Sequence, residues 1–114
     1  MKNVLFNEIV FILTKLIEEL TNEQLKQDLN IIKKQLTNAN KHGSYSVKKF
    51  KNILSRYELT QPIITNDKAL EYLKALELLS KLTLEYYELE ECDLVSTPTE
   101  NALFMFLNVI NYLK

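Results

Sequence analysis

Residues 67–90 read DKALEYLKALELLSKLTLEYYELE, and this stretch decides the fold. Apolar side chains recur along it every three or four positions, which is the spacing of one face of an α-helix. The residues on this face are Ala69, Tyr72, Leu73, Leu76, Leu79, Thr83 and Tyr86, and Ala75, Leu78, Leu82 and Leu89 widen it to more than half of the circumference. Asn66 precedes the stretch and can cap its first turn. We therefore predict a long helix over 67–90 that shorter helices cover on several sides.

Two helices are expected near the N-terminus. The first covers residues 3–20, and its inward positions include Val4, Leu5, Ile9, Leu13, Leu16 and Leu20. The second covers residues 22–38, with an apolar stripe of Leu25, Leu29, Ile32 and Leu36. Thr21 and Gln24 match a capping box, which predicts that the second helix begins between them.

A third helix is expected after a loop. The loop is NANKHGS, residues 38–44, in which Gly43 can adopt a positive φ without strain. Ser46 can cap a helix over 47–59, whose inward residues are Val47, Phe50, Ile53, Leu54 and Tyr57. The following segment, TQPIIT at 60–65, should be extended because Pro62 disfavours helical geometry in the residue before it.

The last predicted helix covers residues 98–113. Thr97 and Glu100 form a capping box around Pro98, which favours a helix start. Nearly all of its residues are apolar, and Asn101, Asn108 and Asn111 lie close to one line. Two interpretations stay open, a helix within the core that has a thin polar edge, and a face exposed for a partner or a second copy. Phe104, Phe106 and Ile110 can accordingly seal a core or the seam of a homodimer.

Composition excludes several fold classes. The chain has 114 residues, 46% of them hydrophobic, with one glycine and two prolines. So few turn-forming residues argue against sheet-rich designs. We predict an all-α protein, a single domain over 1–114 folded as an antiparallel bundle of four to five helices.

Cysteine content and hydropathy bear on location. The single Cys92 cannot form an internal disulfide, which favours a reducing, cytoplasmic environment. The apolar run IVFIL at 9–13 is too short to span a bilayer, so we expect no integral membrane protein. Peripheral association with the inner face of the membrane stays open.

Charge is distributed unevenly along the chain. The net charge is −1, from 14 basic and 15 acidic residues. Between Leu29 and Tyr57 there is no acid, while seven basic residues occur there: Lys33, Lys34, Lys41, Lys48, Lys49, Lys51 and Arg56. Such an arrangement favours association with an acidic partner.

Residues suited to catalysis are scarce. The one histidine, His42, lies in the predicted basic loop, and the carboxylates of Glu91 and Asp93 beside Cys92 disfavour the thiolate that nucleophilic chemistry needs. The sequence contains no recognisable zinc-ligand spacing and no glycine-rich phosphate loop. We predict no catalytic, cofactor-binding or metal-binding residues, and therefore no enzyme.

The candidate functional residues belong to a partner-binding surface. They come from the basic segment and from the last predicted helix: Lys41, Lys48, Lys49, Lys51, Arg56, Phe104, Asn108 and Asn111. A helix with exposed lysines can meet an acidic protein, an anionic membrane surface or the phosphates of a nucleic acid, and an ordinary solvated face stays open as well. The connection at 38–45 is about twice as long as the 3–4-residue turn of a helix-turn-helix, so nucleic acid is the less favoured partner.

The order of these segments resembles that of the immunity proteins of class II bacteriocins. The resemblance runs over about residues 8–90 and lies in LIEEL, TNEQLKQDLNIIKKQLTNA, KKFKNIL, the proline-containing link and the long Leu/Tyr helix. It implies a cytoplasmic four-helix bundle that protects a producing cell from its own pore-forming peptide. It also implies association with the complex of the bacteriocin and its membrane receptor, a sugar phosphotransferase permease, and places specificity in the region from Glu91 to Lys114.

The predicted function is therefore binding rather than catalysis. An immunity protein against an antimicrobial peptide is the leading hypothesis. The alternative is a small phage or mobile-element protein that associates with nucleic acid as a regulator or inhibits a host protein.

Overall fold

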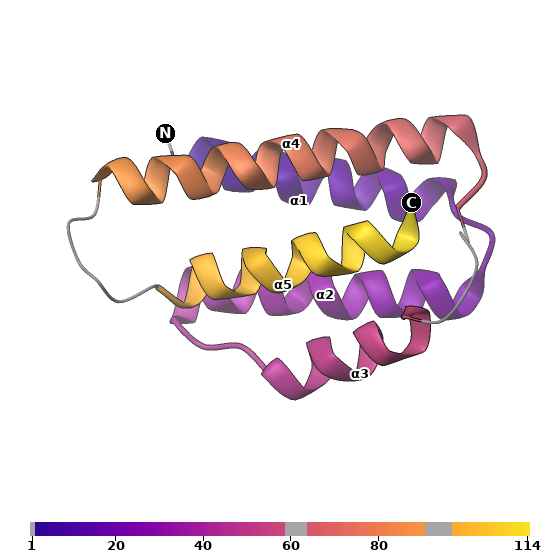
Figure 1. Ribbon diagram of the computed structural model, residues 1–114, viewed down its shortest axis with the longest axis horizontal. Helices are drawn as coiled ribbons and strands as arrows, with labels where there is room; N and C mark the ends of the chain where they lie inside the picture. Colours follow the sequence, from indigo (N-terminus) through magenta and orange to yellow (C-terminus); the bar gives the residue numbers. More distant parts are fainter. Residues whose placement is uncertain (1, 59–63, 91–96) are drawn as a thin grey trace.

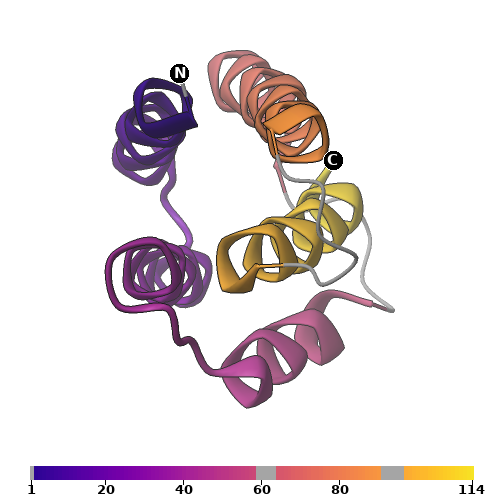
Figure 2. The same cartoon turned by 90° about the vertical axis from the view of Figure 1, so that its left-hand side faces the viewer.

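A ring of four long helices forms the body of the protein. The computed structural model describes residues 2–58, 64–90 and 97–114. Its helices are α1 (Lys2–Glu19), α2 (Glu23–His42), α3 (Val47–Tyr57), α4 (Asp67–Glu90) and α5 (Pro98–Leu113). Seen end-on, α1, α2, α5 and α4 follow one another around the ring, and neighbours run antiparallel (Figure 1, Figure 2). This arrangement confirms the predicted all-α bundle.

The shorter helix α3 lies outside the ring. It packs across α2 and α5 on the side away from α4 (Figure 2). Phe50, Ile53 and Tyr57 turn toward the core, where each is at least 95% buried. The helix therefore covers the edge between α2 and α5 and leaves its opposite face to solvent.

Local capping signals predicted several helix boundaries correctly. The bounds of α4 and α5 agree with the predicted ranges. Asn66 Oδ1 accepts a hydrogen bond from the amide of Ala69, and Ser46 caps α3 through the amide of Lys49. At α5, the side chains of Thr97 and Glu100 complete the capping box. These caps form because each satisfies an amide that the helix leaves without an internal partner.

The boundaries predicted for α2 were wrong at both ends. Its cap is Asn22, whose Oδ1 accepts from the amide of Leu25, while Gln24 donates to Asp28 rather than completing a box with Thr21. The helix also continues to His42, through most of the stretch 38–44 that was predicted to be a loop. It ends only at Gly43, which has a φ of 70°, the left-handed geometry of a helix C-cap.

The third predicted helix is shorter than expected. It ends at Tyr57, and residues 59–63, which include most of the segment expected to be extended, lie outside the described part of the chain. The expectations for Cys92, Glu91 and Asp93 likewise fall outside the described residues.

The predicted central role of α4 was wrong. Helix α4 packs against α1 and α5 only, and neither α2 nor α3 reaches it within the described residues. Helix α5 instead contacts α2, α3 and α4, and it buries Ala102, Leu103, Phe106, Val109, Ile110 and Leu113 almost completely. The nearly all-round apolar surface of α5 explains this position, because such a helix must be covered on several sides.

Some residues predicted to point inward lie on the surface. The exposed fractions are 66% for Val4, 42% for Val47 and 68% for Leu78. Leu78 borders a hollow between α4 and the end of α5 together with Lys114. No described helix is both long enough and apolar enough to cross a membrane.

Candidate partner-binding surface

Helix α3 is attached to the bundle at its N-terminal end by side chains around Ser46. The amide of Ser46 donates to Oε1 of the buried Gln35 on α2 over 2.7 Å. The ring of the neighbouring Tyr45 meets that of Phe50 edge to face, with 5.7 Å between centroids. The Tyr45 hydroxyl also lies 4.0 Å from Sδ of Met105 on α5. The start of α3 is therefore tied to both helices that it covers.

The C-terminal end of α3 is held by a buried carboxylate. Asp28 on α2 is fully buried and accepts hydrogen bonds from Arg56 Nε at 3.1 Å and Arg56 Nη2 at 2.7 Å. The Tyr57 hydroxyl donates to the same carboxylate at 2.5 Å, and Gln24 donates at 3.2 Å. These contacts satisfy the Asp28 oxygens, which is required because an unpaired buried charge is costly.

Arg56, which was predicted to contact a partner, therefore already forms an ion pair with Asp28 inside the protein. Its side chain is 44% exposed, but its guanidinium binds Asp28. This hydrogen bond raises the pKa of Arg56 above its ordinary value. Sequence reasoning missed Asp28, although a signal existed. Asp28 lies on the same stripe as Leu25, Leu29 and Ile32, and a charged residue in an apolar stripe requires a partner.

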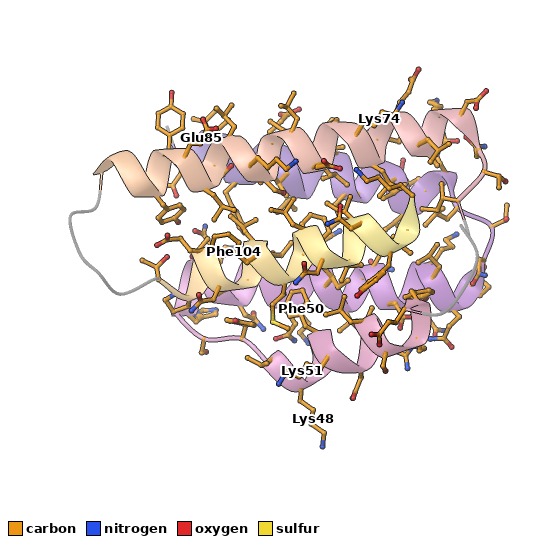
Figure 3. The ribbon with its side chains drawn as sticks, viewed as in Figure 1. Lys48, Phe50, Lys51, Lys74, Glu85 and Phe104 are labelled. Atoms are coloured by element: carbon orange, nitrogen blue, oxygen red, sulfur yellow. The ribbon has the colours of Figure 1, made fainter. Side chains whose placement is uncertain are left out.

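The three lysines of α3 remain unneutralised. Lys48, Lys49 and Lys51 are exposed, and no carboxylate of the described residues forms an ion pair with any of them. Figure 3 shows Lys48 and Lys51 on the outer side of α3, pointing away from the bundle. Because α3 is fixed at both ends, these charges have a defined position relative to the bundle.

The other predicted basic residues lie on α2. Lys41 is exposed in the last turn of α2, where a positive charge complements the helix dipole. Lys33 is half-buried and donates to Thr14 Oγ1 on α1 over 3.1 Å, so it supports the contact between α1 and α2. Within the basic segment, Lys33 and Arg56 therefore have polar partners, whereas Lys34, Lys41 and the three lysines of α3 are exposed and form no ion pair with any described residue.

The predicted residues on α5 form its exposed edge. Asn101, Asn108 and Asn111 are exposed, and Phe104 is 48% exposed, while Phe106 and Ile110 are buried in the core. The structure therefore shows a core helix with a thin polar edge, and it leaves two aromatic side chains of α5, Phe104 and Tyr112, partly exposed. Since α3 packs on α5, the predicted residues of these two helices belong to neighbouring elements. Their role in binding stays a prediction.

Acidic residues gather on the opposite side of the molecule. Glu8 and Glu18 on α1 and Asp67, Glu71 and Glu85 on α4 are exposed. In Figure 2, α1 and α4 lie at one end of the cross-section and α3 at the other. The charge asymmetry of the sequence therefore becomes a dipole across the folded protein, with α3 at its positive end.

One carboxylate on α4 is neutralised within the chain. Glu77 binds Lys81 over 2.9 Å and also Lys114 at the end of α5, and both contacts lower the pKa of Glu77. Lys74, Leu78 and these three residues line a shallow hollow between the two helices. Across the described residues, no three His, Cys, Asp or Glu side chains lie close enough together to hold a metal ion.

Comparisons with family models, with curated proteins and with solved structures found no match to this chain. A functional proposal therefore depends on the surfaces described above and on the segment order of the sequence.

Proposed function

We propose that the protein is a non-enzymatic binding protein of the bacteriocin immunity type. It meets an acidic surface of its partner with the lysines of α3, and the exposed edge of α5 adds contacts beside them. The partner is the bacteriocin–receptor complex of a bacterial membrane, approached from the cytoplasmic side.

The observation that carries this proposal is the state of Lys48, Lys49 and Lys51. Three exposed charges without a carboxylate partner among the described residues occupy one helix that is fixed at both ends. Preorganised charge speeds encounter with an oppositely charged surface and selects against wrong partners. Arg56 lies on the same helix but is already neutralised by Asp28, so the lysines supply the charge that a partner meets.

The choice of partner comes from the resemblance of the sequence to immunity proteins. The bundle fold and the lysine-rich third helix are both compatible with it. Helix α5 belongs to the region that the resemblance associates with specificity, and Phe104 is the more exposed of its two accessible aromatic residues, the other being Tyr112. Aromatic residues are enriched among those that dominate binding energy.

The test is a triple charge reversal on α3. Lys48→Glu, Lys49→Glu and Lys51→Glu together should abolish capture of the receptor complex from bacterial membranes and should sensitise cells that produce the protein. The control variant carries Lys15→Glu, Lys26→Glu and Lys34→Glu on α1 and α2, which change the net charge equally, and should retain both activities. Capture and protection that survive the α3 reversal would overturn the proposal.

Nucleic acid is the competing partner for the same three lysines. Three phosphate contacts predict an affinity that falls about fortyfold between about 50 and about 200 mM salt. We expect no binding of duplex DNA at the lower salt concentration in fluorescence anisotropy. Binding with that salt dependence, lost in the α3 triple variant, would instead favour a nucleic-acid-associated regulator.

A further inference from the structure

A hollow lies between the first part of α1 and the last part of α2, which are neighbours in the ring (Figure 2). Its volume is about 170 Å³. The residues that line it are Phe6, Asn7 and Val10 of α1 and Thr37, Asn40 and Lys41 of α2. An apolar cavity of about 150 Å³ is large enough for benzene. This α1–α2 hollow can therefore hold one ring or one branched alkyl group.

The floor of the α1–α2 hollow is apolar. Phe6 is buried and Val10 is half-buried, so their hydrocarbon side chains form the deeper part of the lining. Thr37 is half-buried as well, and its hydroxyl already donates to the carbonyl of Lys33 over 2.9 Å. An apolar group in the hollow would therefore lose contact with water without covering an unsatisfied polar atom of the floor.

The rim of the hollow carries polar groups that are available to a ligand. Asn7 and Lys41 are exposed, and Asn40 is half-buried. None of these three side chains forms a hydrogen bond or an ion pair with another residue that the structure describes. Each amide can donate two hydrogen bonds, and the lysine adds a full positive charge.

The acids of α1 do not face the hollow. Glu8 is two positions from both Phe6 and Val10, and at about 100° per residue this places it on the far side of α1 from them. Glu18 and Glu19, at the other end of α1, each form an ion pair with a lysine. Helix α4 and its acids pack on the other side of α1 from α2 (Figure 2).

The α2 side of the hollow is basic. Helix α2 has no acid after Asp28, and that carboxylate is buried and paired with α3. Lys33 lies one turn before Thr37 and is half-buried, and it donates to Thr14 Oγ1 but forms no ion pair with any described carboxylate. At the start of α5, Glu100 accepts hydrogen bonds within its own capping box. The described part of the chain therefore leaves the charge of this hollow positive.

We propose that the α1–α2 hollow binds a small organic carboxylate that carries one ring or one branched alkyl group. The apolar group lies on Phe6 and Val10. The carboxylate accepts from Lys41 and from the amides of Asn7 and Asn40. An apolar surface with a few convergent polar groups is typical of small-molecule sites. One lysine and two neutral amides suit a head group with a single negative charge, and the basic surroundings exclude a cation.

The test is a titration of the isotope-labelled protein with benzoate, followed by the NMR shifts of its backbone amides. We expect saturable shifts at residues 7, 10, 40 and 41, with a dissociation constant of about 1 mM, since so few ligand atoms make contact. Benzyl alcohol has the ring without the charge, and acetate has the charge without the ring. Each should bind about tenfold more weakly than benzoate or worse.

Two substitutions at the rim test the role of charge. Lys41→Gln removes the cation, and Asn40→Asp places a carboxylate beside the ligand with little change of shape, so each should weaken benzoate binding about fivefold or more. Lys34→Gln and Asn30→Asp make the same changes of charge elsewhere on α2. At about 150 mM salt these positions, about 10 Å or more from the rim along the helix, should leave the affinity unchanged.

This site is separate from the lysines of α3 and does not depend on the proposed function. The α3 triple variant should bind benzoate as the wild type does, so loss of partner capture and loss of this site are distinguishable. Circular dichroism should show unchanged helicity for every variant. The proposal would be overturned by shifts that do not saturate or that map to α3, by equal binding of benzyl alcohol, or by full affinity in Lys41→Gln.

Discussion

The guanidinium of Arg56 reaches the carboxylate of Asp28 through two hydrogen bonds, and this contact joins residues 28 positions apart in the chain. It fastens the end of α3 to α2 at a point where the carboxylate is buried and the guanidinium is half-exposed. A paired charge therefore anchors the helix whose three lysines have no carboxylate partner among the described residues. Arg56 carries the same positive charge as the lysines of α3, but its role is to position the helix and not to contact a partner.

Loss of the Arg56 side chain should destabilise the fold. Arg56→Ala leaves the Asp28 carboxylate buried with fewer donors, and breaking such a pair costs about 3–5 kcal/mol when both partners are buried. Because Arg56 is partly exposed, we expect about 2 kcal/mol in urea unfolding. Lys49→Ala on the same helix should change stability by less than about 0.5 kcal/mol. Equal effects of the two substitutions would contradict the anchoring role.

The pH dependence of stability should show the contribution of Tyr57. Burial, together with the hydrogen bond to Asp28, raises the pKa of Tyr57 above its ordinary value of 10. The folded chain thus keeps the phenol proton where the unfolded chain releases it. This stabilisation is complete below pH 10 and is lost as the pH rises further. The stability advantage of the wild type over Tyr57→Phe should therefore stay constant up to about pH 9 and shrink as the pH rises above about 10, and parallel curves across that range would disprove the coupling.

Two phenylalanines on α5 should respond very differently to truncation. Phe106 is 1% exposed at the centre of the bundle, whereas Phe104 is about half exposed. Phe106→Ala should cost about 3–5 kcal/mol, because it removes apolar contacts and leaves a cavity. Phe104→Ala should cost under about 1 kcal/mol. Thermal and urea unfolding of the pair would test the position of α5, and similar losses would count against it.

Replacement of the buried Ser80 should stabilise the protein. Its side chain is fully buried on α4, and among the described residues its Oγ is the buried side-chain polar atom without a hydrogen-bond partner. Ser80→Ala removes this unsatisfied group and improves helix propensity, which should add about 1 kcal/mol of stability. Thr83→Val is the contrasting variant. It should bring no such gain in stability, because Thr83 Oγ1 already donates to the carbonyl of Leu79. A loss of stability in Ser80→Ala would show that the hydroxyl has a partner.

Local sequence signals predicted the helices and most of their caps. The ranges of α4 and α5 follow from apolar spacing and from Asn66 and Thr97, which act on amides within three residues. The error at the start of α2 arose because Asn22 and Thr21 are both good caps, and only the folded chain shows which one accepts the bond. The error at its end arose because residues 38–42, which were predicted to be a loop, can also continue the helix, so that α2 ends only at the left-handed Gly43.

The candidate surfaces could be predicted only in part. The exposed lysines of α3 and the asparagine edge of α5 follow from helical periodicity, since polar residues at that spacing avoid the core. The bond between Arg56 and Asp28 and the exposure of Leu78 could not be predicted this way. Both depend on which helices lie beside α2 and α4 in space.

The sequence by itself determined that this chain folds as a bundle of four to five helices and that positive charge is concentrated around the third. Those features depend on side chains three or four positions apart, so the local periodicity of the sequence specifies them. Only the tertiary structure decided that α5, like α2, packs against three other described helices, whereas α4 packs against two. It alone paired Arg56 with Asp28, left Lys48 without a carboxylate partner among the described residues, and left Leu78 exposed. These outcomes depend on contacts between distant residues, which local periodicity does not specify.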